Sequence, residues 1–291
     1  MGFGAVRYRS ADGLSLHARD YGARGGGTPV LCLPGLTRNA KDFDTLAERL
    51  APGRRVVCAD FRGRGLSQYG EPASYRADIE MADTLALMDQ LDIARAAVVG
   101  TSRGGIVAMF LAARAKARLA GIAFNDVGPR LEPEGLLRIR SYLSPAASFS
   151  SWAEAAAAVR ATNAGVAGLT DGQWLSFARR LFRDEDGVPV IDYDPGLIAN
   201  FPDRETIESG KVPELWALFD AVAPLPALVL RGANSDLLSA LTVSEMERRH
   251  GDLTAVTVEG RGHVPFLDEA ESLAAIDDWL RRVDAFAARS G

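Results

Sequence analysis

Short apolar runs alternate with amphipathic segments along the first part of the chain. Runs such as 29–33, 96–99 and 119–124 carry almost no polar side chains, which is typical of strands buried on both faces. Between them, apolar residues recur at helical spacing, for example in 79–91 and 106–115. This alternation predicts an α/β fold, with a mostly parallel, doubly wound sheet flanked by helices on both faces.

The pattern changes at two places. At the N-terminus, alternating residues in 5–10 and 14–21 flank an Asp-Gly pair, which predicts a β-hairpin. After Pro129 no convincing buried strand is found until residue 227, where strands and helices resume. We therefore expect one core, residues 1–130 and 223–291, interrupted by a helical cap insertion over residues 131–222. Helices are expected in that insertion at 136–143, 152–162, 173–182 and 214–222.

Composition narrows the class of protein. With 47% hydrophobic residues, 24% charged residues and a net charge of −5, the chain is typical of an ordinary soluble globular protein. An acidic balance does not favour nucleic acid or an anionic membrane as a partner. Cys32 and Cys58 each stand in an apolar run, which favours buried free thiols and a cytoplasmic location. Oligomeric state stays open.

Ser102 is the first candidate for chemistry. It stands in Gly-Thr-Ser-Arg-Gly, at 100–104, between a predicted strand and a predicted helix. This is the Gly-x-Ser-x-Gly nucleophile elbow, in which glycines allow a turn too tight for larger side chains. A glycine-rich phosphate loop is disfavoured, because the segment has neither the lysine nor the spacing of such loops.

A serine nucleophile needs a base, and the chain has only three histidines. His17 lies in the predicted hairpin, and His250 ends an amphipathic helix where a solvated position explains it. His263 lies in Gly-Arg-Gly-His-Val-Pro, a loop that follows the last predicted strand. Sites in such folds assemble at the carboxyl ends of the strands, where this loop begins, so His263 is the expected base.

The base in turn needs an orienting acid, and two aspartates are candidates. Asp236 follows the strand predicted at 227–230, and the chain order serine, aspartate, histidine is the one found in α/β-hydrolases. Asp126, at the end of the preceding core strand, is the alternative, with a structural role in tying loops as its competing interpretation. We favour Asp236.

The oxyanion formed during acyl transfer needs preorganised donors. We expect the backbone N–H groups of Arg103, directly after the nucleophile, and of Leu36, in the loop after the strand at 29–33. The Arg103 side chain opposes the dipole of its helix unless it is paired. A salt bridge, for instance to Asp126, is favoured over contact with an anionic group of the substrate.

These motifs together resemble those of the α/β-hydrolase superfamily, in its capped form. The resemblance covers roughly residues 5–130 and 223–288 and implies a serine hydrolase of small carboxylic esters or lactones, without a metal or organic cofactor. Ser102 argues against the dehalogenases and epoxide hydrolases of this superfamily, which use an aspartate nucleophile. The segments that carry the resemblance are Pro-Gly-Leu at 34–36, Asp-Phe-Arg-Gly-Arg-Gly-Leu-Ser at 60–67, Gly-Thr-Ser-Arg-Gly at 100–104, Gly-Ala-Asn-Ser-Asp at 232–236 and Gly-Arg-Gly-His at 260–263.

The resemblance leaves the reaction open in part. Hydrolysis of a C–C bond in a meta-cleavage-type diketone is one alternative, although Val264 stands where those enzymes usually carry tryptophan. A cofactor-free oxygenase or perhydrolase is another. In the insertion, Trp152, Trp174 and Trp216 are candidate pocket residues, although aromatic residues at helical spacing more often fill a core.

Overall fold

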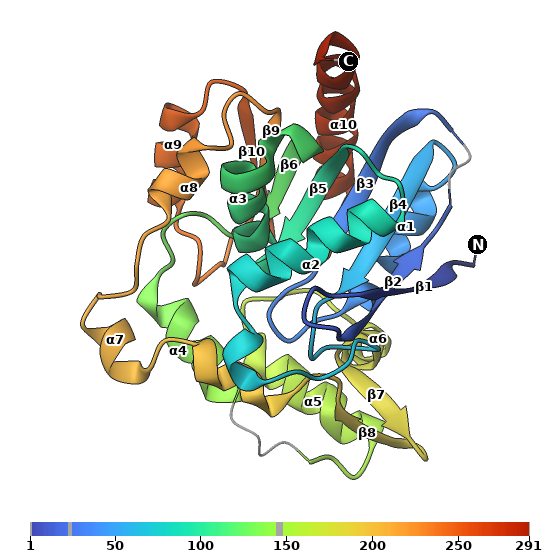
Figure 1. The fold of residues 1–291 in the computed structure, drawn as a ribbon. Coiled ribbons are helices and arrows are strands. Elements are labelled where there is room, and N and C mark those ends of the chain that lie inside the picture. Colours follow the sequence, from blue (N-terminus) through green and yellow to red (C-terminus); the bar gives the residue numbers. More distant parts are fainter. Residues whose placement is uncertain (1, 23–24, 144–147, 291) are drawn as a thin grey trace.

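Eight strands form one sheet in the order β1-β2-β4-β3-β5-β6-β9-β10 (Figure 1). This arrangement comes from a computed structural model, which describes residues 2–22, 25–143 and 148–290. β1 and β2 form the expected antiparallel hairpin, β2 runs antiparallel to β4, and the remaining pairs are parallel. The predicted mostly parallel sheet is therefore confirmed. The strands are β1 (Gly4–Arg9), β2 (Ser15–Asp20), β3 (Gly27–Leu33), β4 (Arg54–Asp60), β5 (Ala96–Thr101), β6 (Leu119–Asn125), β9 (Ala227–Gly232) and β10 (Leu253–Val258).

Helices cover both faces of this sheet. Along β5, Ala96 and Val98 point to one face and Ala97 and Val99 to the other, because side chains alternate along a strand. The first face packs against α2 (Ala77–Gln90), α3 (Arg103–Ala115) and α9 (Ala240–Arg249). The second packs against α1 (Asp44–Leu50) and α10 (Ala270–Ser290). Short 3-10 helices lie at Ala40–Phe43, Pro72–Ser74, Lys116–Arg118 and Pro195–Asn200.

The turn from β5 into α3 is tighter than a side chain allows. A Cβ atom on Gly104 would lie 2.0 Å from the carbonyl oxygen of Leu33, and one on Gly100 would lie 2.6 Å from the backbone of Gly104. Ser102 adopts φ 48° and ψ −110°, a backbone conformation that costs free energy in a residue with a side chain. The flanking glycines thus let the first turn of α3 press against β3, with Ser102 at the apex.

The segment between β6 and β9 lies at one end of the sheet. Figure 1 shows α4, α5, α6 and a two-stranded hairpin gathered at the end toward which the arrows of β4 and β5 point. Its helices α5 and α6 share an apolar cluster that includes Val159, Trp174 and Phe177. The elements are α4 (Pro133–Tyr142), α5 (Trp152–Thr162), α6 (Asp171–Leu181), β7 (Phe182–Glu185), β8 (Val188–Ile191), α7 (Arg204–Glu208) and α8 (Trp216–Asp220).

Two features of this segment differ from expectation. The sequence predicts no strand between Pro129 and residue 227, whereas β7 and β8 pair around a tight turn in which Asp186 and Gly187 have positive φ. The Asp-Gly pair is typical of a hairpin turn, but these two strands are short and mostly not buried, so no buried apolar run marks them. In addition, α8 packs on α3, and its Phe219 belongs to the main core cluster rather than to the cap.

Two further observations concern the cysteine thiols and membrane-spanning helices. Cys32 and Cys58 are free and buried, as predicted. In the described part of the chain, no helix combines the length and the apolar character that crossing a membrane requires.

We expect Gly104→Ala to lower the free energy of unfolding by about 3 kcal/mol or more, because the new methyl group must displace backbone atoms of β3. In thermal unfolding this corresponds to a Tm lower by about 6 °C or more. Gly172→Ala is the matched control, since a Cβ atom there meets nothing within 4 Å in helix α6. Its effect should stay within about 1 kcal/mol. Equal Tm values for the two variants would contradict the close approach at the elbow.

Candidate active site

Ser102, His263 and Asp126 form a continuous hydrogen-bonded series. The Ser102 Oγ lies 3.0 Å from Nε2 of His263, and Nδ1 of the same ring lies 2.7 Å from Oδ2 of Asp126. A carboxylate only accepts hydrogen bonds, so Nδ1 carries the proton and donates it to Asp126. Nε2 is then free to accept the hydroxyl proton of Ser102, which is the arrangement that activates a serine.

Asp126 is held firmly behind the imidazole. It directly follows β6, has φ 53° and is fully buried. Its Oδ1 accepts a hydrogen bond from the backbone N–H of Gly232 at 2.8 Å, and its Oδ2 accepts one from the Ser235 hydroxyl at 2.6 Å. These donors stabilise the charged carboxylate and fix its orientation toward His263.

The expectation that Asp236 contacts His263 is wrong. Asp236 instead accepts two hydrogen bonds from Arg138 of α4, from Nε at 2.5 Å and from Nη2 at 2.8 Å. Burial raises the pKa of Asp236, but the Arg138 guanidinium outweighs this and holds the pKa below its usual range. The loop that was expected to supply the acid contributes Gly232 and Ser235, which support Asp126.

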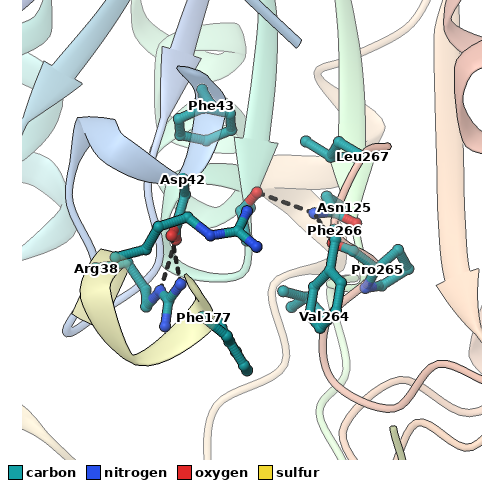
Figure 2. Close-up of a pocket in the computed structure, with 11 residues that line it drawn as sticks. Arg38, Asp42, Phe43, Asn125, Phe177, Val264, Pro265, Phe266 and Leu267 are labelled. Atoms are coloured by element: carbon teal, nitrogen blue, oxygen red, sulfur yellow. Dashed lines mark hydrogen bonds and ion pairs between the residues drawn. The ribbon is translucent and has the colours of Figure 1, made fainter. Parts of the chain in front are cut away.

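Asn125 fastens the loop that carries His263. From the end of β6, its Nδ2 donates to Thr101 Oγ1 and to the backbone oxygen of Pro265, each at 3.0 Å. Figure 2 shows Asn125 beside the 264–267 segment, with Arg38, its partner Asp42 and Phe177 on the opposite side of a small pocket. The ends of β5 and β6 are thereby tied directly to the histidine loop.

The two amides expected to bind an oxyanion lie in the loop after β3 and at the start of α3. A Cβ on Gly35 would lie 3.9 Å from the Cβ of Ser102, so the loop after β3 approaches the nucleophile closely. The described residues supply no hydrogen-bond acceptor to the amide of Leu36. Arg103 begins α3, and the first amides of a helix have no partner within it. Their role as oxyanion donors stays a prediction.

A cavity of about 250 Å³ opens over Ser102 and His263. Its floor comes from the sheet edge, and its walls come from the segment between β6 and β9. Two arginines, Arg38 and Arg138, also face it. The apolar and aromatic walls include Leu36, Ile139, Tyr142, Phe149, Val159, Phe177, Leu181, Phe182, Ile191 and Tyr193.

The tryptophans expected in the pocket lie elsewhere, because none of the described residues that line the cavity is a tryptophan. Trp152 donates from Nε1 to Asp184, and Trp174 is 4% exposed inside the apolar cluster of the cap. Trp216 packs edge-on against Phe219 of the main core. Each of these side chains therefore packs elsewhere, and the aromatic residues between β6 and β9 that line the cavity are Tyr142, Phe149, Phe177, Phe182 and Tyr193.

The side chain of Arg103 points away from the cavity. Its Nε lies 2.6 Å from Oε2 of Glu80, a buried residue of α2, and its Nη2 donates to the backbone oxygen of Tyr75 at 3.1 Å. The favoured interpretation, a salt bridge, is correct, but the partner is Glu80 rather than Asp126. Contact with a substrate anion is excluded by this orientation.

Residues 30–276, most of the chain, match the model of the alpha/beta hydrolase family, in agreement with the sequence motifs and the site geometry. The chain belongs to this family.

Two relatives that match most of this chain are named as hydrolases. The chain is 35% identical over 250 residues to a 3-hydroxybutyrate-oligomer hydrolase of Cupriavidus necator, covering 83% of this chain and 85% of the relative. It is 26% identical to a 2-(acetamidomethylene)succinate hydrolase of Mesorhizobium japonicum, covering 86% and 85%. A crystal structure of an alpha/beta hydrolase from Novosphingobium aromaticivorans superposes with a TM-score of 0.88 at 42% identity, covering 97% of this chain and 99% of that one.

We expect Asp126→Asn to slow serine modification by a fluorophosphonate by about 10⁴-fold, because an amide in place of the carboxylate favours the wrong tautomer of His263. Asp236→Asn, which keeps the side-chain shape in the neighbouring loop, should change that rate by less than about tenfold. The measurement is the rate constant of covalent labelling, which needs no knowledge of the substrate. A larger loss in Asp236→Asn than in Asp126→Asn would assign the orienting role to Asp236.

Proposed function

We propose that this alpha/beta hydrolase is a serine hydrolase that cleaves small carboxylic esters through an acyl-enzyme. One observation carries the proposal: the hydrogen-bonded series from Ser102 through His263 to Asp126 opens into a mostly apolar cavity. A serine activated in this way is a nucleophile toward an acyl carbon. Apolar walls lower the local dielectric constant, which strengthens electrostatic interactions with developing charge.

The reaction follows from these positions. The Ser102 Oγ attacks the ester carbonyl while Nε2 of His263 takes the hydroxyl proton, and the carbonyl oxygen becomes an oxyanion facing the amides of Leu36 and Arg103. Collapse of this intermediate breaks the C–O bond, and the departing alcohol receives the proton from His263. A water molecule then attacks the acyl-enzyme and gives its proton to His263, which returns it to Ser102. Asp126 stabilises the imidazolium in both halves.

The choice of ester rests on size and on the named relative. A cavity of about 250 Å³ suits small molecules rather than polymer chains or lipid droplets. The relative at 35% identity is named for 3-hydroxybutyrate oligomers, and their linkage is a carboxylic ester between two short hydroxy acids. We therefore propose short linear oligomers of this kind as the first substrates to test, with simple lactones beside them.

Such an oligomer carries a free carboxylate, and we propose that Arg138 binds it. Arg138 lines the cavity, and its side chain is 27% exposed. A guanidinium has five N–H donors, of which Asp236 engages two. The pairing with Asp236 fixes the plane of the guanidinium, and fixed donors lose less entropy when they bind a planar carboxylate.

The test of the proposed function is a substrate panel with purified wild type beside Ser102→Ala. We expect turnover of short-chain aryl esters and of the 3-hydroxybutyrate dimer, falling steeply once acyl chains exceed about eight carbons because the cavity is small. Ser102→Ala should lose this turnover and its labelling by fluorophosphonates. Hydrolysis confined to meta-cleavage diketones would replace ester cleavage by C–C cleavage. Efficient hydrolysis of long-chain triglyceride emulsions would contradict the small cavity.

Arg138→Met should raise KM for the 3-hydroxybutyrate dimer about tenfold, the equivalent of about 1.4 kcal/mol, while KM for the methyl ester of that dimer changes less than about twofold. The double variant Arg138→Met/Asp236→Asn should show the same changes in KM as Arg138→Met. This comparison separates loss of the cation from repulsion of the substrate by an unpaired Asp236. Arg140→Met is the matched control, because Arg140 belongs to the same helix and donates to the backbone oxygen of Pro202. Equal changes in KM for the acid and its methyl ester would contradict carboxylate recognition by Arg138.

A further inference from the structure

Three charged side chains lie behind the site, on the side away from the cavity. Arg64 and Glu80 have side chains that are 0% exposed, and the side chain of Arg103 is 16% exposed. Arg64 belongs to the Asp-Phe-Arg-Gly-Arg-Gly-Leu-Ser segment, which the proposed chemistry does not use. None of the three lines the cavity over Ser102 in the described residues. Contact with a substrate in the cavity therefore does not explain why these charged side chains are buried.

The three side chains connect the two residues whose amides are expected to bind the oxyanion. Nε of Arg64 donates to the backbone oxygen of Leu36 at 2.7 Å. Nη1 of Arg64 lies 2.8 Å from Oε1 of Glu80 as an ion pair without hydrogen-bond geometry, and Nε of Arg103 donates to Oε2 of Glu80 at 2.6 Å. The contacts therefore run without a gap from Leu36 to Arg103, with Glu80 in the middle.

Further contacts fix the two arginines in place. The Arg64 Nη1 also donates to the backbone oxygen of Arg62 at 2.6 Å, and its guanidinium lies 5.5 Å from the ring centroid of Tyr75. Arg103 donates from Nη2 to the backbone oxygen of the same Tyr75 at 3.1 Å. Each guanidinium is thus held by the backbone as well as by Glu80.

Stability alone does not account for this arrangement. Removing charges from water costs free energy that a buried ion pair often fails to recover, and a cation in the first turn of a helix opposes the helix dipole. Burial lowers the pKa of Arg64, as expected for a cation removed from water, while the charge of Glu80 acts in the opposite direction. A buried ionic group of this kind can instead specify one geometry.

We propose that Glu80, through Arg64 and Arg103, fixes the distance between the Leu36 and Arg103 amides and thereby shapes the oxyanion hole. This inference rests on the proposed function. The two amides come from separate segments, the loop after β3 and the start of α3, so contacts between these segments must set their spacing. Donors act on an oxyanion when each lies within about 2.7–3.1 Å of it, and a shift of about 1 Å costs about 100-fold in rate. Glu80 and Arg64 are positioning residues in this account, and they do not touch the substrate.

Glu80→Gln keeps the shape of the side chain and removes the charge that holds both arginines. Of the two ion pairs that Glu80 makes, Arg103→Met removes only the one with Arg103. We expect each variant to lower kcat on a short aryl ester by about 10- to 100-fold while KM stays within about threefold. Affinity for a boronic acid that forms a tetrahedral adduct on serine should fall by the same factor as kcat. Arg103→Lys, which keeps a cation, should recover part of the loss.

The matched control is Asp83→Asn. Asp83 lies on the same helix, one turn from Glu80, and is buried in a pair with Arg62 at 2.7 Å, but the Arg62 side chain contacts neither Leu36 nor Arg103. Asp83→Asn should lower Tm as Glu80→Gln does, with kcat within about threefold of wild type. Comparing kcat per folded molecule in the two variants separates an effect on the geometry of the oxyanion hole from a loss of folded protein.

The outcomes distinguish the two proposals. The positioning role is overturned if folded Glu80→Gln and Arg103→Met keep kcat and boronic acid affinity within about threefold of wild type. An equal loss of kcat in Asp83→Asn overturns it as well. If Glu80→Gln does not fold, the partly exposed Arg103→Met and Arg103→Lys decide the question alone. Wild-type protein that neither labels with a fluorophosphonate nor hydrolyses an ester refutes the proposed function itself.

Discussion

The close approach of α3 to β3 at the nucleophile elbow is the constraint on which the rest of the site depends. The carbonyl of Leu33 occupies space that a side chain on Gly104 would need, so the helix begins against the strand rather than beside it. Ser102 is left at the apex with a strained backbone, and the first amide of α3 is left without an internal partner. One local contact therefore sets both the nucleophile and one expected oxyanion donor.

Parallel pairing brings the remaining groups to the same edge. β6 pairs with β9, and β9 pairs with β10, so their carboxyl ends and the loops that follow lie side by side. Asp126 leaves β6 directly and reaches His263, while the loop after β9 donates to Asp126 from Gly232 and Ser235. The pairing thus explains why a loop can support an acid that stands on the neighbouring strand.

This adjacency also explains what the sequence could and could not predict. The sheet, Ser102 and His263 follow from local patterns: alternating elements, a five-residue turn and a glycine-rich loop. The choice between Asp126 and Asp236 depends on how two adjacent loops turn, and on Arg138, which approaches from a distant helix. The prediction that tryptophans line the pocket was wrong for a similar reason. Helical spacing indicates that Trp216 faces inward, but this side chain packs against the main core and does not line the cavity.

Buried charge is divided between the two sides of Ser102. In front, Arg138 lines the cavity and pairs with Asp236, so a change there alters what a substrate meets. Behind, Arg64, Glu80 and Arg103 connect backbone segments, and the side chains of Arg64 and Glu80 are shielded from solvent. An ion pair at a cavity wall can exchange its partner for a ligand, whereas one sealed between segments can only hold or release them. Under the proposed function, the front pair selects the ester and the rear group sets the geometry in which it reacts. The two can therefore change independently, because among the described residues no hydrogen bond or ion pair joins the side chains of one group to those of the other.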